Sequence, residues 1–126
     1  MKNFNRLFLH LGLLLTVSFG MISCKKDPSV LKVFVRSASN ELVTNAEVVV
    51  IGNKSANPPA LDFVDTLFTN GSGYVEFNMD AYFDEVKEKN AAAEFNLIVK
   101  KDLKFGNGNV RCRVHNTAVE TVFLSN

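Results

Sequence analysis

The chain has 126 residues, with 14 Lys and Arg against 13 Asp and Glu and a formal net charge of +1 at pH 7. This balance, with no basic cluster, argues against nucleic acid as a partner. Hydrophobic residues make up 47% of the chain, which is enough for one domain with a core of its own.

The N-terminal segment combines a basic start with an apolar stretch. Lys2 and Arg6 stand among the first six residues without an acid, and residues 7–19 are mostly apolar, although His10 interrupts them. This order is typical of a secretory signal, and the stretch is short for a membrane-spanning helix, which needs about 20 apolar residues. An uncleaved N-terminal membrane anchor is the alternative.

The apolar stretch leads into Met21-Ile22-Ser23-Cys24, which resembles the lipobox of bacterial lipoproteins. The resemblance implies that residues 1–23 are a cleaved signal peptide and that Cys24 accepts the lipid. Ser23-Cys24-Lys25-Lys26-Asp27 also resembles the junction of small Bacteroidetes-type outer-membrane lipoproteins. We therefore expect a lipid-anchored outer-membrane protein, on the periplasmic face or at the cell surface, with residues 24–29 as a lipidated tether and 30–126 as the domain.

Cleavage after Ser23 would leave 103 residues with 12 basic and 13 acidic side chains, because Lys2 and Arg6 lie in the removed part. Acylation of Cys24 would leave Cys112 as a single thiol, so an intrachain disulfide is excluded. The stability of the domain must then come from apolar packing.

The remainder is typical of short strands separated by turns. Asn70-Gly71-Ser72-Gly73 is a strong turn signal, since Gly and Asn accept positive φ. Residues 52–61, with Pro58-Pro59, and residues 102–109, with Gly106-Asn107-Gly108, are predicted loops. Alternation of apolar and polar residues, or short β-branched runs, predicts strands at residues 31–36, 46–51, 63–69, 74–77, 95–100, 110–115 and 119–124.

Residues 80–90 depart from this pattern. Asp80 is placed to cap a helix, and Glu85 and Lys89 stand at i,i+4 spacing. We expect a short surface helix here, with an irregular crossover loop as the alternative. The whole predicts an all-β, seven-stranded antiparallel sandwich with one short helix or crossover insert at about 80–90.

Two sequence patterns resemble a known family. Val43-x-Asn45-Ala46-x-Val48-x-Val50 is followed by Thr69-Asn70-x-x-Gly73-x-Val75-x-Phe77 and later by Phe95-x-Leu97-x-Val99. Together they resemble the carboxypeptidase-regulatory-like or transthyretin-like branch of Ig-like sandwiches. The resemblance implies that fold over most of residues 30–124 and implies little about function.

The residues that carry chemistry are few. After the predicted signal His115 is the single histidine, and Cys112 lies on the opposite face of the same predicted strand, so neither a zinc site nor a Cys–His nucleophile is expected. We interpret Cys112 as a buried, inert thiol. Asp80, Asp84 and Glu85 lack the spacing of a calcium loop. We expect no catalytic residues, no metal and no cofactor.

One modification signal is present. Asp65-Thr66-Leu67 resembles the Asp-Ser/Thr-aliphatic O-glycosylation motif of Bacteroidetes-type exported proteins. The resemblance implies a glycan on Thr66, although a strand residue also matches so short a motif by chance.

The function expected from these residues is recognition without catalysis. We predict a non-catalytic, membrane-anchored lipoprotein that acts as a protein-binding or assembly module at the cell envelope, with Leu103 and Phe105 of the 102–109 loop as candidate partner contacts. Both side chains could instead tuck under the domain. The alternative is a carbohydrate- or peptide-binding surface lipoprotein, although Trp is absent and only Tyr74 and Tyr82 offer a hydroxyl-bearing ring.

Overall fold

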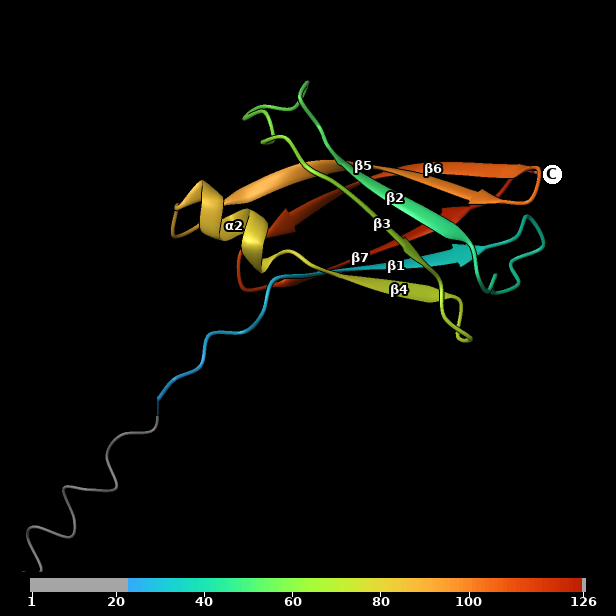
Figure 1. The fold of residues 1–126 in the computed structure, drawn as a ribbon, viewed down its shortest axis with the longest axis horizontal. Coiled ribbons are helices and arrows are strands. Elements are labelled where there is room, and N and C mark those ends of the chain that lie inside the picture. The colour runs from blue at the N-terminus through green and yellow to red at the C-terminus, as the bar shows by residue number, and fades with distance from the viewer. Residues whose placement is uncertain (1–22, 126) are drawn as a thin grey trace, which may run out of the picture.

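The computed structural model describes residues 23–125, whose strands form two sheets packed face to face (Figure 1). One sheet has the strand order β4-β1-β7 and the other β3-β2-β5-β6. The all-β sandwich expected from the sequence is confirmed. The elements are β1 (Val30–Arg36), β2 (Glu47–Gly52), β3 (Val64–Phe68), β4 (Tyr74–Asn78), α2 (Asp80–Val86), β5 (Ala92–Lys101), β6 (Lys104–Arg113) and β7 (Thr117–Phe123).

The core lies between the sheets and follows from strand alternation. In β1, β2 and β5 every second residue is buried, because successive side chains of a strand point to opposite faces. An aromatic cluster fills one end, where the ring centroids of Tyr82 and Phe63 lie 5.0 and 5.7 Å from that of Phe95. Burial of such a side chain contributes about 1.5–3 kcal/mol, so this cluster is a major source of stability.

One strand pair departs from the antiparallel arrangement expected from the sequence. β7 pairs with β1 in parallel, with Val30 opposite Thr117 and Arg36 opposite Phe123. The reason is the connection before β7. β6 belongs to the other sheet, and the chain turns back after Arg113 to enter the first sheet beside β1, in the same direction.

The predicted loop at 102–109 is wrong, because β6 begins at Lys104 and runs through both glycines. A Cβ on Gly106 would lie 2.5 Å from the carbonyl oxygen of Phe123, and one on Gly108 would lie 3.2 Å from a methyl carbon of Val122. These glycines therefore allow β7 to approach β6 closely and do not form a turn. The actual turn is confined to Asp102 and Leu103.

The helix is real but shorter than the predicted 80–90 segment. It ends at Val86 because Lys87 takes the left-handed conformation, with φ of 60°, and its N–H donates to the carbonyl of Phe83. Asp80 does not cap this helix, since the N-cap position is Met79. The Asp80 carboxylate instead accepts a hydrogen bond of 2.7 Å from the Ser29 N–H, fifty-one residues away in the chain.

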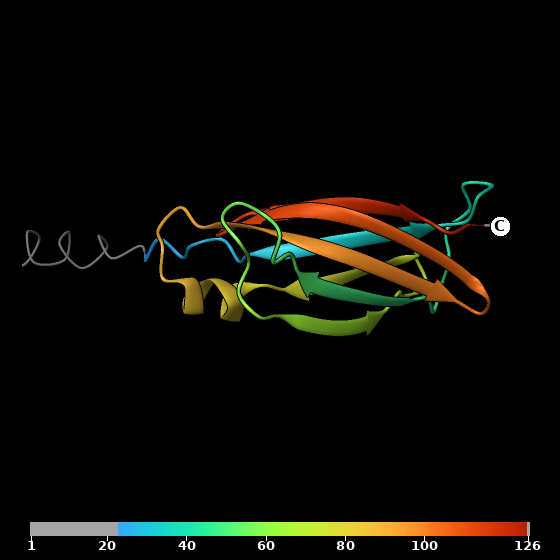
Figure 2. The same cartoon turned by 90° about the horizontal axis from the view of Figure 1, so that it is seen from above.

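The segment before β1 is fixed to the domain at Ser29. The Ser29 carbonyl accepts from the Met79 N–H at 2.8 Å, and its hydroxyl accepts from the His115 N–H at 2.8 Å. The chain enters the domain at the end that carries α2, here called the tether end. The C-terminus and the β5–β6 turn lie at the opposite, distal end (Figures 1 and 2).

The predicted signal peptide lies outside the described residues, apart from Ser23. Within residues 23–125, no helix has the length and apolar character needed to cross a membrane.

Candidate functional site

The outward face of the four-stranded sheet carries a second set of apolar side chains besides the core. β2 contains the run Val48-Val49-Val50-Ile51, so apolar residues point both inward and outward. Apolar residues on both faces are typical of strands that are covered on both sides. The outward set, here called the outer patch, consists of Val49, Ile51, Val64, Phe68, Ile98 and Phe105.

The strand register brings the outer patch together. Val49 of β2 lies opposite Ile98 of β5, and Ile51 lies opposite Val64 of β3. Val64 is 68% exposed and Ile98 is 45% exposed, so no described residue covers them. A continuous exposed apolar surface on a globular domain commonly marks a contact with another molecule.

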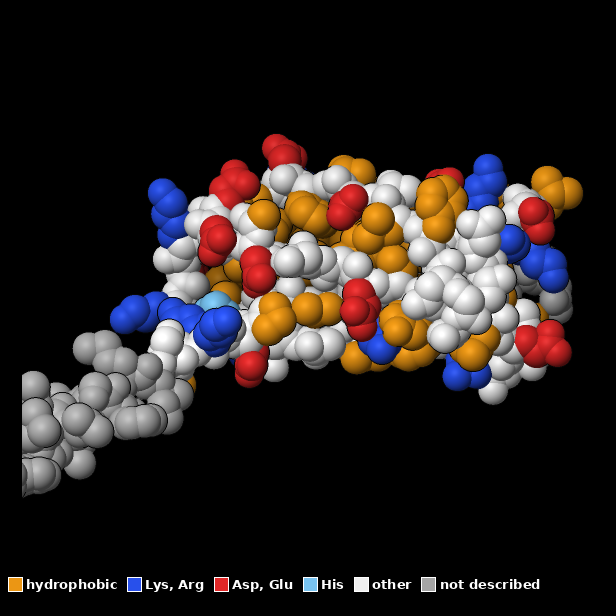
Figure 3. All heavy atoms as spheres, turned by 60° about the horizontal axis from the view of Figure 1, so that its bottom comes forward, with side chains coloured by type: hydrophobic (Ala, Val, Ile, Leu, Met, Phe, Trp, Pro, Cys, Tyr) orange, Lys and Arg blue, Asp and Glu red, His pale blue; other side chains and the backbone are white. Residues whose placement is uncertain are grey.

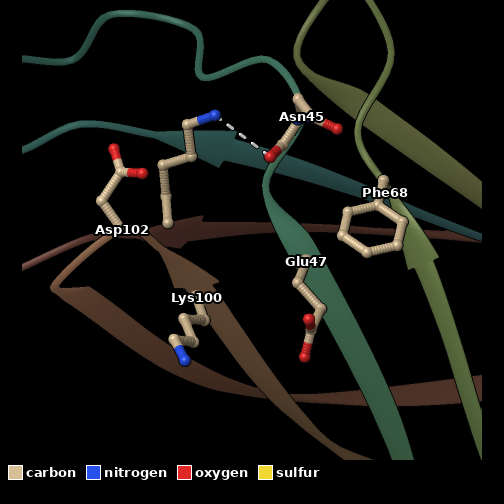
Figure 4. A pocket seen from close by; sticks show the side chains of 6 residues that line it. Asn45, Glu47, Phe68, Lys100 and Asp102 are labelled. Atoms are coloured by element: carbon tan, nitrogen blue, oxygen red, sulfur yellow. Dashed lines mark hydrogen bonds between the residues drawn. The ribbon is translucent and has the colours of Figure 1, made fainter.

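Toward the distal end the outer patch becomes mixed apolar and charged. Phe68 lies opposite Glu47, and Lys100 lies opposite Phe105, with its Nζ 5.8 Å from the centre of the Phe105 ring. The side chains here surround an open hollow of about 220 Å³, lined by Asn45, Glu47, Phe68, Lys100, Lys101 and Asp102. In Figure 4, Glu47 lies between the Phe68 ring and Lys100.

Leu103 and Phe105, the predicted partner contacts, both lie outside the core. Leu103 is 93% exposed at the turn between β5 and β6, where Asp102 has a φ of 53°. Phe105 is 53% exposed and belongs to β6. The alternative that these side chains tuck under the domain is therefore wrong, and a wholly exposed leucine stands at the distal end.

The distal hairpin also carries unpaired positive charge. Lys100, Lys101 and Lys104 flank Leu103, and none forms an ion pair with an acid in residues 23–125. The Lys101 Nζ donates instead to the Asn45 carbonyl at 3.2 Å (Figure 4). This end can therefore accept negative groups of a partner next to an apolar contact.

Five members of the outer patch were not predicted as contacts from the sequence. Val49, Ile51, Val64, Phe68 and Ile98 lie in predicted strands that were interpreted only through their inward side chains. The signal was present, because a two-sided apolar run predicts a strand buried on both faces.

Thr66, the predicted glycosylation site, is exposed on β3, an outermost strand of its sheet. The carboxylate of Asp65 accepts a hydrogen bond of 2.8 Å from the Thr66 N–H. Asp65 itself lies on the inward side, opposite Val50. A charged residue on the inward side of an edge strand hinders pairing with another strand.

The two residues weighed as a Cys–His pair lie in different surroundings. Cys112 is 1% exposed, and its burial raises the pKa of the thiol to about 12, which leaves it protonated and unreactive at neutral pH. His115 lies in the turn after β6, with φ of 57°, and not in the strand in which it was predicted. Within residues 23–125, no group of three His, Cys, Asp or Glu side chains is placed to hold a metal ion.

The two tyrosines are not free aromatic platforms. Tyr82 is buried, and its hydroxyl accepts from the Leu61 N–H at 3.1 Å. The Lys32 Nζ lies 3.8 Å from the centre of the Tyr74 ring and 3.5 Å from the Glu76 carboxylate, so it covers one face of that ring.

Figure 3, turned so that the β4 side of Figure 1 comes forward, shows hydrophobic side chains open to view along the molecule.

Comparison with known proteins gives only a distant structural similarity. No protein-family model matches the chain, and no curated protein matches it. Among solved structures, a mutant of Acinetobacter radioresistens catechol 1,2 dioxygenase matches with a TM-score of 0.49 and 10% identity, over 83% of this chain. The match covers 54% of the dioxygenase chain, so this chain spans about half of it. We draw no functional conclusion from a similarity of this extent.

Proposed function

We propose that the protein is a non-catalytic, membrane-anchored protein-binding or assembly module of the cell envelope. The observation that carries the proposal is the outer patch, which continues at the distal end into a wholly exposed Leu103. An apolar surface fringed by Lys100, Lys101 and Lys104 suits a partner protein whose own apolar surface is bordered by acidic groups.

The anchor at Cys24 sets the orientation of this surface. Because Ser29 and the Asp27 carbonyl are bonded to the domain, only residues 24–26 are free as a tether, and they reach less than roughly 11 Å. A lipid on Cys24 would hold the tether end close to the bilayer. The ten-residue strand β5 spans about 34 Å at 3.4 Å per residue, so Leu103 would face away from the membrane.

The resemblances support the same proposal in finer detail. Met21-Ile22-Ser23-Cys24 suggests a Bacteroidetes-type lipoprotein of the outer membrane, and the strand patterns suggest a carboxypeptidase-regulatory-like or transthyretin-like domain. A carbohydrate-binding function has less support, because Tyr82 is buried and Lys32 covers Tyr74. A glycan on Thr66 is a separate proposal, and an intact mass equal to polypeptide plus lipid would reject it.

Photo-crosslinking in intact membranes tests the recognition surface. A photoreactive phenylalanine analogue replaces Phe68 or Leu103 in the full-length chain, and the matched control replaces Phe123. Phe123 lies on the other sheet and is 54% exposed, against 57% for Phe68. We expect Phe68 and Leu103 to capture the same protein and Phe123 to capture none. Equal capture from all three positions would contradict the proposal.

Fatty-acid labelling tests the anchor independently. The wild-type chain should incorporate an alkyne-tagged palmitate during growth, and Cys24→Ser should not. A Cys24→Ser variant that carries the label and stays with membranes to the same extent would reject lipid attachment at this thiol.

A further inference from the structure

The tether end holds a second hollow, distinct from the one beside Phe68. It has a volume of about 440 Å³, and its lining includes Lys89, Asn90, Arg113, His115 and Asn116. Among residues 23–125, no acidic residue lines it. Two further lining residues, Ala91 and Val114, are joined by the hydrogen bond of 3.0 Å that the Val114 N–H donates to the Ala91 carbonyl.

Lys89 and Arg113, which line this hollow, can donate hydrogen bonds to negatively charged oxygen atoms. Within residues 23–125, neither Lys89 nor Arg113 forms an ion pair. The nearby Arg111 does pair, with Glu94 at 3.8 Å, so it is not available in the same way. Arg is suited to a phosphate because its guanidinium donates two parallel hydrogen bonds, and Lys adds a compact positive charge.

His115 has a defined orientation at the rim of the hollow. Its left-handed backbone conformation places its N–H on the Ser29 hydroxyl, and its Nδ1 lies 2.9 Å from the Asp27 carbonyl oxygen. Because a carbonyl oxygen only accepts, Nδ1 is the donor, and the ring is held between the tether and the hollow. The tether thus runs directly past the site.

The hollow lies where the chain leaves for the membrane. Lys25 and Lys26 precede the bonded part of the tether, and Figure 3 shows Lys or Arg side chains on either side of the histidine at this end. Acids also lie at this end but outside the lining: Asp27 in the tether, Asp80, Asp84 and Glu85 in α2, and Glu88 after it. The lining of the hollow itself is therefore positively charged.

We infer that this hollow binds the phosphate of a lipid headgroup and so fixes the domain against an anionic membrane surface. The inference rests on the proposed anchoring at Cys24, since the lipid brings the tether end to the bilayer. Lys25 and Lys26 of the tether add two cations to Lys89 and Arg113 of the hollow, and at an anionic membrane surface each cation contributes roughly fivefold to affinity.

Amide hydrogen exchange on the lipidated protein in nanodiscs tests the inference. One set of discs contains phosphatidylcholine alone, and the other contains phosphatidylcholine and phosphatidylglycerol in a two-to-one mixture. We expect exchange at residues 113–116 to slow severalfold in the anionic discs only. The distal turn at 101–104 serves as an internal reference and should not change.

Matched double variants identify the site. Lys89→Gln with Arg113→Gln should abolish the slowing, whereas Lys101→Gln with Lys104→Gln removes the same charge at the distal end and should preserve it. Equal exchange in both kinds of disc, or equal loss in both double variants, would overturn the inference.

Inorganic phosphate, added to the protein in uncharged detergent, separates the two sources of the ligand. Slowing at 113–116 by phosphate alone shows that the hollow takes the free anion, and slowing only in anionic discs shows that it takes the headgroup in a bilayer. Failure of anchoring is seen separately, as an intact mass without lipid. In that case the phosphate titration still decides, and no effect at 113–116 rejects the site.

Discussion

On the β6 and β7 side of the sandwich the two sheets meet backbone to backbone, whereas on the β3 and β4 side their edges scarcely touch. The closed side depends on Gly106 and on the hydrogen bond of 2.8 Å that the Ser125 N–H donates to the Phe105 carbonyl. On the open side, Leu67 remains 38% exposed although it points inward.

This difference separates stability from recognition. The closed side admits no extra atom, so substitution there disturbs the backbone of a neighbouring strand. The exposed side chains of the open side and of the outer patch beside it accept changes at little cost, because they already contact water. A surface that is free to vary without loss of the fold is where a binding function is expected to lie.

The largest effect should follow Gly106→Ala. The new Cβ would lie 2.5 Å from the Phe123 carbonyl oxygen, and a backbone atom cannot move aside as a flexible side chain can. We expect a loss of about 2–3 kcal/mol in the free energy of unfolding, measured by urea denaturation. Gly71→Ala is the control, since no atom of the described part of the chain lies within 4 Å of its Cβ position, and it should change stability by less than about 0.5 kcal/mol. Equal effects of the two variants would show that the closed side tolerates movement.

A loss of similar or smaller size should follow Thr69→Val, at a buried hydroxyl that holds the start of the open side. The Thr69 hydroxyl donates to the Val43 carbonyl at 2.7 Å and accepts from the Ala46 N–H at 2.9 Å. Valine keeps the shape and leaves both backbone groups without that partner, at a cost of about 1–3 kcal/mol. Thr66→Val, in the exposed middle of β3, is the matched control and should be nearly neutral. A neutral Thr69→Val would mean that the open side is not held by this contact.

The burial of Cys112, on β6 of the closed side, should make the free energy of unfolding depend on pH. Burial raises the pKa of its thiol to about 12, above the ordinary value of 9.0, so the folded protein keeps a proton that the unfolded chain releases. Stability should therefore fall as the pH rises above about 9, by up to about 1.4 kcal/mol per pH unit until the pH nears 12. The difference between wild type and Cys112→Val isolates this contribution from the other groups that titrate there. Parallel curves for the two proteins would contradict the burial of the thiol.

The strands were predictable from the sequence because alternation along a strand is a local property, and so was the short helix. The role of Gly106 was not, because glycine signals a turn and a close approach equally well, and only the position of β7 decides between them. Asp80 was placed correctly at the helix start, but its carboxylate is bonded to Ser29, a partner that no local pattern indicates.

The candidate site was predicted in part for a related reason. Leu103 and Phe105 were named because they are apolar residues in the segment predicted as the 102–109 loop, while Phe68 and Ile98 look like ordinary strand residues. Their exposure depends on what covers the outer face, which is a property of the assembled sheet. The parallel pairing of β1 with β7 is likewise set by the route of the chain between the sheets. The alternation of apolar and polar residues carries no information about that route.

The smallest effect on stability should accompany the largest effect on binding. Phe68→Ser removes a half-exposed ring from the outer patch and should change the free energy of unfolding by less than about 0.5 kcal/mol. It should nevertheless reduce the yield of the protein captured by a crosslinker at Leu103, because both side chains would contact the same partner. Phe123→Ser removes a ring of equal exposure from the other sheet and should leave that yield unchanged. An equal loss of yield with Phe123→Ser and Phe68→Ser would contradict the assignment to the outer patch. The outer patch would then not differ from the rest of the surface, and the recognition surface would be the distal end as a whole.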